Sequence, residues 1–240
     1  MKMPNVRKIA AETLRPISRL SAAHSLSGSQ DRRSIRSAYR IAAIDDDVFP
    51  HKSRLRELGF QIDYFSKLEE IDRELHYGLY VCDIMGVEAD TVEDGVWTMR
   101  EIKLRAPVSP LLGYTYLSPV NAKYQSARNI CDAIVRKSDE IDELVRNLDD
   151  LIIEINNPVD LWRRIRGYLL LQGIETRHVA VLEHYFVTAV LKRSPERFGE
   201  KAQRFLVDEG LSAVIVDAIP LVAKSIGSKL IKSSLGLSPH

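Results

Sequence analysis

Five short apolar runs alternate with segments of helical periodicity between residues 39 and 156, and this alternation restricts the possible folds more than any other feature. Strands that alternate with helices along a chain are typical of a parallel sheet covered by helices. We therefore predict an α/β fold, a doubly wound five-stranded parallel sheet. The expected strands are YRIAAID (39–45), FQIDYFS (60–66), LYVCDIM (79–85), PLLGYTY (110–116) and DAIVRKS (132–138). The expected helices lie near 50–58, 67–77, 95–105 and 119–130, and a longer one follows over 139–156.

The first 38 residues differ in composition from the rest, with eight Lys or Arg against two acidic residues and a Ser/Gly-rich stretch, SLSGSQ, at 25–30. We interpret residues 1–38 as a basic N-terminal extension with one helix over 5–15 and a flexible linker after it. The uninterrupted apolar core of a signal peptide is missing, whereas the Arg/Ser-rich, acid-poor composition fits an organelle transit peptide. A docking extension and a transit peptide both stay open.

Residues 157–240 show helical periodicity without alternating strands, so we predict an all-α effector or interaction region after an α/β domain that spans 39–156. Asn157 and Pro158 supply a helix cap and a first-turn proline. The nearly all-apolar segment VAVLEHYFVTAVL should lie at the centre of a small bundle. Charged residues and a proline interrupt 211–233, so no transmembrane segment is expected. The expected helices cover 158–171, 177–192, 195–208 and 211–233.

The output of this helical region has three candidate forms. A protein-interaction or dimerisation role is the favoured one. The basic clusters RRIR (163–166) and KRSPER (192–197) leave nucleic-acid binding open, although no segment resembles a helix-turn-helix with an exposed recognition helix. The Lys-bearing face of 211–233 leaves an amphipathic, membrane-active tail open. His178 and His184 are six residues apart and would face apart on a helix, so we interpret them as packing residues rather than metal ligands.

The overall charge and the cysteines limit the class of protein. A net charge of +1 argues against attraction of the whole protein to nucleic acid or membranes. Cys82 and Cys131 lie in apolar contexts without the spacing of metal ligands. We interpret both as reduced core residues, which favours a cytoplasmic protein.

Polar residues gather where the expected strands end. Three aspartates, Asp45 to Asp47, follow the first strand, Asp83 stands near the end of the third, Thr115 ends the fourth and Lys137 ends the fifth. The carboxyl ends of parallel strands share one edge of the sheet, which is where α/β proteins of this type bind ligands. An acidic residue at the end of an apolar strand is costly to bury unless it is paired. Carboxylates, a hydroxyl and an ammonium should therefore meet at this edge.

With these residues on these strands and in this order, residues 39–155 resemble the receiver domain of response regulators, the phosphoacceptor module of two-component signalling. The resemblance implies that Asp83 accepts a phosphoryl group, that Thr115 is the switch hydroxyl and that Lys137 pairs with the phosphate. A histidine kinase or another phosphodonor would be the partner, and the protein would not be a turnover enzyme. The resemblance also implies a Mg²⁺ site. Its ligands would be Asp45, Asp46, Asp83 and the backbone carbonyl of Met85, with Asp46 as the direct ligand and Asp47 as an accessory acid.

The chain also departs from the receiver pattern. The loop GVEADTVEDG (86–95) lacks the proline that usually follows the phosphoacceptor and contains four acidic residues. Bulky Tyr116 follows Thr115 where a small residue is usual, and Ser138 follows Lys137 where a proline is usual. A phosphorylatable domain is favoured by the complete set of polar residues, and a receiver-like docking module without phosphorylation stays open. A Mg²⁺-dependent phosphohydrolase is disfavoured because Met85 stands where a second acidic residue would be needed.

The long helix over 139–156 carries an apolar seam with alternating spacings of four and three. Its members are Ile141, Val145, Leu148, Ile152 and Ile155. Such spacing suits a coiled-coil contact, although a helix that packs on a sheet shows a similar stripe. We predict a homodimer in which the far half of this helix and the 158–171 helix contact a second copy. Packing of the whole seam on the sheet is the alternative.

Overall fold

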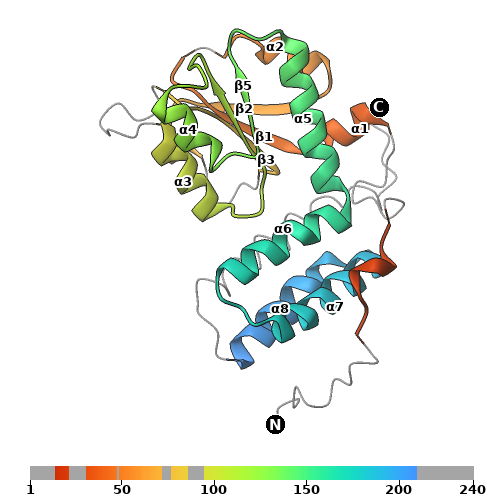
Figure 1. The fold of residues 1–240 in the computed structure, drawn as a ribbon. Helices are drawn as coiled ribbons and strands as arrows, with labels where there is room; N and C mark the ends of the chain where they lie inside the picture. The colour runs from red at the N-terminus through yellow and green to blue at the C-terminus, as the bar shows by residue number, and fades with distance from the viewer. Residues whose placement is uncertain (1–13, 22–30, 48, 72–76, 86–94, 210–240) are drawn as a thin grey trace. The chain divides into compact units, whose positions relative to one another are not determined.

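The computed structural model describes residues 14–21, 31–47, 49–71, 77–85 and 95–209 (Figure 1). These residues belong to two compact units. Residues 31–156 make up the first, here called the α/β unit, and residues 14–21 join 157–209 in the second, here called the helical unit. Each is described by itself. The domain ranges 1–38, 39–156 and 157–240 stay predictions.

The α/β unit is built on one five-stranded parallel sheet, which confirms the predicted fold class. Its strand order is β2-β1-β3-β4-β5, so the chain moves first to one side of β1 and then to the other. The register aligns Ile44 of β1 with Cys82 of β3, Asp83 with Tyr114 of β4, and Thr115 with Arg136 of β5. The strand ends are therefore level at one edge. The strands are β1 (Arg40–Ile44), β2 (Gln61–Phe65), β3 (Leu79–Asp83), β4 (Leu111–Thr115) and β5 (Ala133–Arg136).

The helices of this unit agree with the expected ranges in part. The expected helix over 67–77 is wrong in its described part, a short 3₁₀ helix, and residues 72–76 lie outside the described residues. The helix expected over 119–130 begins only at Ala122, because the side chain of Asn121 accepts the N–H of Lys123 and caps it there. The elements are α1 (Arg32–Ser37), α2 (Lys52–Glu57), η5 (Leu68–Glu70), α3 (Gly95–Arg105), α4 (Ala122–Arg128) and α5 (Ile141–Asn156).

Two hydrophobic clusters cover the two faces of the sheet, because successive strand residues point to opposite sides. Ile41 and Ala43 of β1 face the cluster that includes Leu148 of α5, whereas Ala42 and Ile44 face the cluster that includes Met99 of α3. Figure 1 shows α5 on one side of the sheet and α3 and α4 on the other. The sheet is thus a middle layer between helices, and its carboxyl edge is left for polar side chains.

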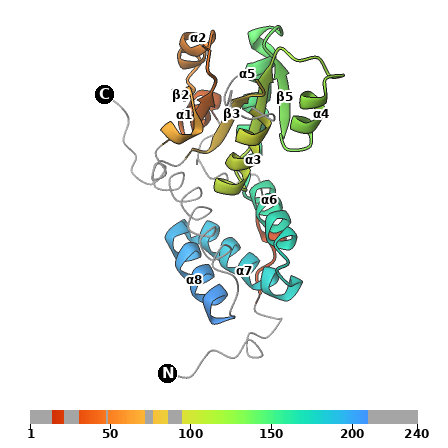
Figure 2. The ribbon, with the colours of Figure 1, turned by 90° about the vertical axis from the view of Figure 1, so that its left-hand side faces the viewer.

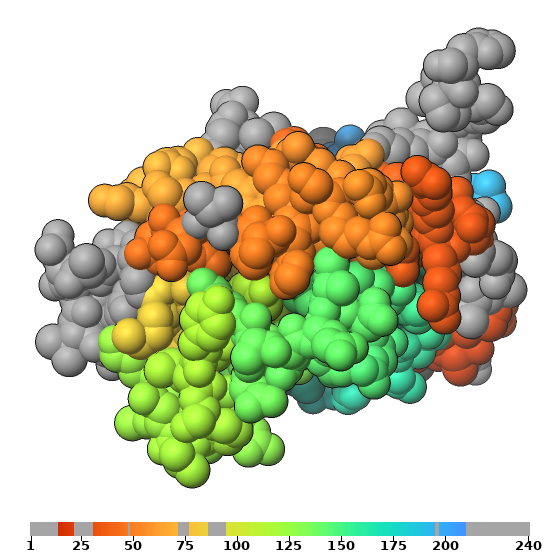
Figure 3. All heavy atoms as spheres, turned by 90° about the horizontal axis from the view of Figure 1, so that it is seen from above, coloured from red at the N-terminus to blue at the C-terminus, as the bar shows by residue number. Residues whose placement is uncertain are grey.

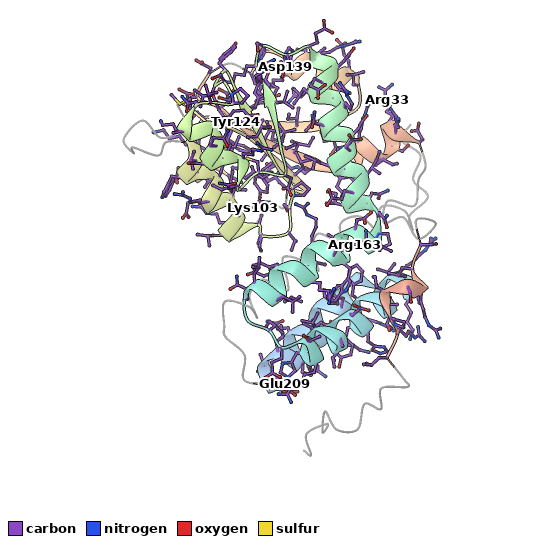
Figure 4. All side chains as sticks on the ribbon, viewed as in Figure 1. Arg33, Lys103, Tyr124, Asp139, Arg163 and Glu209 are labelled. Carbon is purple, nitrogen blue, oxygen red and sulfur yellow. The ribbon has the colours of Figure 1, made fainter. Side chains whose placement is uncertain are left out.

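Helix α1 was not expected from the sequence, and a buried ion pair attaches it to α5. The guanidinium of Arg36 donates to both carboxylate oxygens of Asp149, at 2.7 and 2.6 Å, and to the carbonyl of Leu58 at 2.8 Å. It also lies 4.6 Å from the ring centroid of Phe60. Arg33, one turn earlier, is exposed and points outward (Figure 4). Part of the segment predicted as a flexible linker is therefore packed helix.

The apolar seam of α5 is internal core rather than a dimer contact. Leu148, Ile152 and Ile155 are 0 to 1% exposed and belong to the cluster on the sheet face. Leu144 and Leu151 widen the same buried stripe. The prediction that Ile152 and Ile155 contact a second copy is wrong for these two side chains, because the sheet already covers them. A homodimer through another surface stays a prediction.

The described residues of the helical unit form three α-helices, α6 (Pro158–Leu171), α7 (Thr176–Lys192) and α8 (Pro195–Asp208). Figure 2 shows α7 between the other two. The ring of Phe186 in α7 packs at a tilt against Trp162 of α6, with ring centroids 5.2 Å apart, and edge-to-face against Phe198 of α8 at 5.7 Å. The central place predicted for α7 is confirmed. The expected helix over 211–233 and most of that over 5–15 lie outside the described residues.

Residues 14–21, here called the strap, pack on the helical unit as extended chain with one 3₁₀ turn, η3 (Ile17–Arg19). The backbone N–H of Arg15 donates to Nδ1 of His184 at 3.0 Å, and that of Ile17 donates to Glu183 at 2.8 Å. The other oxygen of Glu183 accepts the indole N–H of Trp162 at 2.8 Å. Neighbouring side chains of α7 therefore bind the strap backbone. Within the described part of the chain, no helix is long and apolar enough to cross a membrane.

Candidate functional site

The carboxyl edge of the sheet brings together the polar residues predicted there. Asp45 directly follows β1, and its N–H donates to the carbonyl of Phe65 in β2. Asp83 and Thr115 are the last residues of β3 and β4. Lys137 follows β5, and its N–H donates to the carbonyl of Thr115 at 2.7 Å. Seen from above (Figure 3), the orange surface of the segment after β1 adjoins the green surface near the start of α5.

Lys137, Asp83 and Asp45 form a buried ion triad at this edge. The ammonium nitrogen of Lys137 lies 2.6 Å from Oδ2 of Asp83 and 2.8 Å from Oδ2 of Asp45. All three side chains are at most 6% exposed. The contact with Asp83 is a hydrogen bond, whereas Oδ2 of Asp45 is ion-paired without hydrogen-bond geometry. Two carboxylates thus share one ammonium, and their charges are only half balanced.

The second oxygen of each carboxylate binds the backbone that follows it. Oδ1 of Asp83 accepts the N–H of Met85 at 3.1 Å, and Oδ1 of Asp45 accepts the N–H of Asp47 at 3.0 Å. The buried hydroxyl oxygen of Thr115 accepts the N–H of Leu117 at 3.2 Å in the same way. Short polar side chains often form such local turns, which here end three strands at a common level.

Burial changes the proton affinities of the triad. It raises the pKa of Asp83 to about 6, an effect that the hydrogen bonds from Lys137 and the Met85 N–H oppose and that nearby Asp45 increases. Burial by itself would lower the pKa of Lys137, but its interactions with the carboxylates of Asp45 and Asp83 together raise that pKa. Lys137 is therefore a firmly protonated cation, and Asp83 accepts a proton more readily than an ordinary aspartate does.

The three consecutive aspartates fit a hard divalent cation. One carboxylate oxygen from each of Asp45, Asp46 and Asp47 lies within 4.8 Å of the others, and Asp46 and Asp47 are exposed while Asp45 is buried. Mg²⁺ prefers oxygen ligands and keeps several water ligands, which suits a cluster with one buried and two exposed carboxylates. The Met85 carbonyl as a further ligand stays a prediction.

Helix α3 begins in contact with the backbone of the site. A Cβ added to Gly95, the first residue of α3, would lie 2.1 Å from the carbonyl oxygen of Asp83 and 2.7 Å from the carbonyl carbon of Ile84. Only glycine allows this approach. Gly95 therefore has a steric reason to stand at the start of α3, which is to let the helix pack beside Asp83.

Two tyrosines contribute to the site without having been predicted as part of it. The ring centroids of Tyr114 and Tyr116 lie 5.6 and 5.7 Å from the ammonium nitrogen of Lys137. Tyr114 is 1% exposed and Tyr116 is 73% exposed. They flank Thr115, so strand alternation places both rings on one side of β4. In the sequence, the signal for this arrangement is that a tyrosine stands directly before and directly after Thr115. The preference of aromatic residues for strands also explains two tyrosines at these positions.

Comparisons with known proteins give matches in structure only. No family model matches the sequence, and no curated protein matches it. One similar structure is the chemotaxis protein CheY4 of Vibrio cholerae, with 13% identity and a TM-score of 0.38 over 47% of this chain and 98% of that chain. Another is a two-component response regulator from Clostridium difficile, with 20% identity and a TM-score of 0.42 over 49% and 98%.

A third similar structure is the BeF3-activated receiver domain of DrrB, with 24% identity and a TM-score of 0.40 over 48% of this chain and 97% of that chain. The chain thus matches response-regulator and receiver-domain structures over about half of its length. Those alignments are likenesses of fold, and the chemistry of the site rests on its own geometry.

Proposed function

We propose that this protein is a response-regulator-like signalling protein that accepts a phosphoryl group on Asp83 with the help of Mg²⁺ and thereby controls its helical region. The observation that carries the proposal is the buried triad, in which Asp83 shares the ammonium of Lys137 with Asp45. A buried group whose pKa is raised beside a specific charge partner is a candidate for a functional site.

Asp83 is the proposed nucleophile. An oxygen of its carboxylate forms the new bond to phosphorus, while the bond from phosphorus to the donor breaks and its electron pair leaves with the donor. Phosphoryl transfer depends mainly on positioning and on charge stabilisation. Lys137 already lies 2.6 Å from Asp83 and supplies a positive charge where the phosphoryl oxygens would gather. Thr115 is the proposed switch hydroxyl beside it.

Asp45 and Asp46 are the proposed side-chain ligands of the cation, together with Asp83 and the carbonyl of Met85. Bound Mg²⁺ would offset the negative charge of the incoming phosphoryl group, so that the carboxylate of Asp83 is not repelled by its substrate. Asp46 is exposed and free to reorient toward the ion, whereas Asp45 is fixed by burial and by the N–H of Asp47. Asp47 would act as an accessory acid.

A histidine kinase or a small-molecule phosphodonor is the proposed source of the phosphoryl group, in the cytoplasm. The proposed output is a protein contact made by the helical unit, and DNA binding is the alternative output. A second candidate function is a receiver-like docking module without phosphorylation. The ion pairing of Lys137 with both carboxylates supports this second function, because the ammonium already offsets part of their buried charge.

We predict that Asp83→Asn abolishes incorporation of phosphate from acetyl phosphate with Mg²⁺ while the fold is retained, because the amide keeps the volume but is not a nucleophile. Phosphoprotein electrophoresis and mass mapping would measure the incorporation. Asp46→Ala should bind Mg²⁺ more weakly and be labelled more slowly. Equal labelling of wild type and Asp83→Asn would place the acceptor elsewhere. Mg²⁺ binding with no labelling of the wild type would favour the docking module.

A further inference from the structure

The ammonium of Lys137 lies close to two aromatic rings as well as to two carboxylates. Its nitrogen is 5.6 Å from the ring centroid of Tyr114 and 5.7 Å from that of Tyr116. The register explains the arrangement, because Thr115 pairs with Arg136 and therefore brings Tyr116 beside Lys137. Cations within about 6 Å of a tyrosine ring face are attracted by the quadrupole of the ring. The two tyrosines are here called the aromatic bracket.

Burial in the core does not explain why both positions carry an aromatic ring. Tyr114 is 1% exposed and belongs to the core cluster on the α5 side of the sheet, so its ring also has a structural role. Tyr116 is 73% exposed, so its ring gains little from burial. The hydroxyl of Tyr114 has no hydrogen-bond partner within the described residues, so a hydrogen bond of that group does not fix the ring. Contact with Lys137 is the feature that the two rings share.

A cation in the aspartate cluster would disturb Lys137. Asp45 belongs to that cluster and also lies 2.8 Å from the Lys137 ammonium. Two cations on one carboxylate repel each other, and the repulsion is strong where solvent does not screen it. Lys137 must then weaken its contact with Asp45 while it stays near Asp83. The rings offer it a favourable neighbourhood that adds no negative charge to the site.

We propose that Tyr114 and Tyr116 are positioning residues that hold the Lys137 ammonium beside Asp83 when a divalent cation binds Asp45 to Asp47. The proposal deepens the proposed function and rests on its cation site, but it does not require that Asp83 be phosphorylated. The bulky residue after Thr115, a departure from the receiver pattern, then has a physical role.

The main test is NMR of the ε-methylene protons of Lys137 during titration with Mg²⁺. An aromatic ring that faces these protons shifts their resonance upfield, and movement toward the bracket should increase the shift. Wild type and the matched control Tyr116→Phe, which keeps the ring, should show the same increase. Tyr116→Leu should show a clearly smaller one. Tyr114→Phe is a second control, because it removes only an unpartnered hydroxyl.

A functional readout accompanies the NMR. With Mg²⁺ present, Tyr116→Leu should bind beryllofluoride about two- to fivefold more weakly than wild type, the range expected for an exposed cation–π contact. The same substitution should have no effect in a Lys137→Met background, whereas a merely structural role would persist there.

Equal upfield shifts in wild type and Tyr116→Leu would overturn the proposal, and so would equal losses of affinity in the two backgrounds. If wild type shows the Mg²⁺-dependent shift but neither binds beryllofluoride nor is labelled, the proposed phosphorylation fails while the bracket stands. If Mg²⁺ leaves the Lys137 resonance unchanged in wild type, the bracket is wrong.

Discussion

The two units treat their buried polar groups differently. In the α/β unit, buried charges meet counter-charges from distant parts of the chain, as Lys137 does with Asp83 and Arg36 with Asp149. In the helical unit, His178 is the buried polar residue among those described, and its Nε2 lies 3.2 Å from a Glu209 carboxylate oxygen without hydrogen-bond geometry. Glu209 ends the described chain (Figure 4). The helical unit packs mainly through apolar contacts.

Within the α/β unit, the two buried ion clusters differ in charge balance. Arg36 and Asp149 form a bidentate pair in which both carboxylate oxygens accept hydrogen bonds, and exposed Arg32 lies 3.9 Å from the same carboxylate. The Lys137 cluster has two carboxylates for one ammonium. Buried charge is costly unless it is compensated, and arginine side chains fully compensate the carboxylate of Asp149. The cluster around Lys137 has more negative than positive charge, so it has capacity for a further cation. The pairing of Arg36 with Asp149 only holds α1 to α5.

The largest effect that would test this contrast is expected for Arg36→Met. It leaves Asp149 buried without its bidentate partner and with only the 3.9 Å contact of exposed Arg32. The free energy of unfolding of the α/β unit should therefore fall by about 3–5 kcal/mol. Urea denaturation followed by Trp97 fluorescence, in a Trp162→Phe background, reports on this unit alone. The double variant Arg36→Met, Asp149→Leu should recover most of the loss. A loss below about 1 kcal/mol would mean that water or Arg32 compensates the Asp149 carboxylate in place of Arg36.

A smaller effect is expected for Gly95→Ala. The added methyl group would overlap the backbone at Asp83, so α3 must shift, and such overpacking costs about 1–3 kcal/mol. Metal or beryllofluoride affinity at the edge should fall with it. The matched control is Gly167→Ala in α6, where an added Cβ meets nothing within 4 Å. That change should stabilise its helix by about 0.5–1 kcal/mol. Equal stability of the two variants would contradict the proposed contact.

The smallest effect concerns pH and the strap. Burial lowers the pKa of His184, and the nearby charges of Arg15 and Lys201 lower it further. Nδ1 must be unprotonated to accept the Arg15 N–H. Because the undocked state binds more protons, docking is fully favoured above the ordinary histidine pKa of about 6.5 and weakens as pH falls below it. The hydrogen bond that Glu183 accepts from the Ile17 N–H stays in place and limits the loss of docking at low pH.

Hydrogen exchange at the amides of Arg15 and Ile17, corrected for the intrinsic effect of pH, would measure this docking. His184→Asn keeps an acceptor oxygen near the same place without a titrating group, so its protection should be independent of pH between 7.5 and about 5.5. Protection that falls equally in wild type and variant would assign the pH effect to another group.

The parts of the fold that the sequence predicted are those that depend on repeated patterns. Apolar runs of strand length predicted the sheet. The positions of Asp45, Asp83 and Lys137 at the ends of these runs predicted that their side chains meet at one edge. The α5 seam was assigned to the wrong partner because a helix shows the same stripe whether it packs on a sheet or on another helix. Periodicity reports that a face is buried and does not report what covers it.

The parts of the fold and of the site that the sequence did not predict depend on single contacts. Helix α1, RRSIRS, has no apolar periodicity, and it is attached by the pairing of Arg36 with a residue 113 positions away. The strap binds α7 through its backbone N–H groups. Every residue except proline has such a group, so the amino-acid composition of the strap does not predict this contact. Tyr114 was missed as a site residue because its apolar strand context explained an aromatic side chain well enough.

The way the chain passes between its units has a consequence for the order of folding. The strap and α7 belong to one unit, yet Ile17 and Glu183 are 166 positions apart with the α/β unit between them. The two ends of the α/β unit are joined by the bond from Tyr39 to Asn156, which spans 117 positions. Once the α/β unit has folded, the loop that must close to bring the strap to α7 is effectively only roughly 50 positions long. The shorter loop lowers the entropic cost of closing it by about 1 kcal/mol. Substitutions that loosen α1 from α5 should therefore delay assembly of the helical unit without touching it.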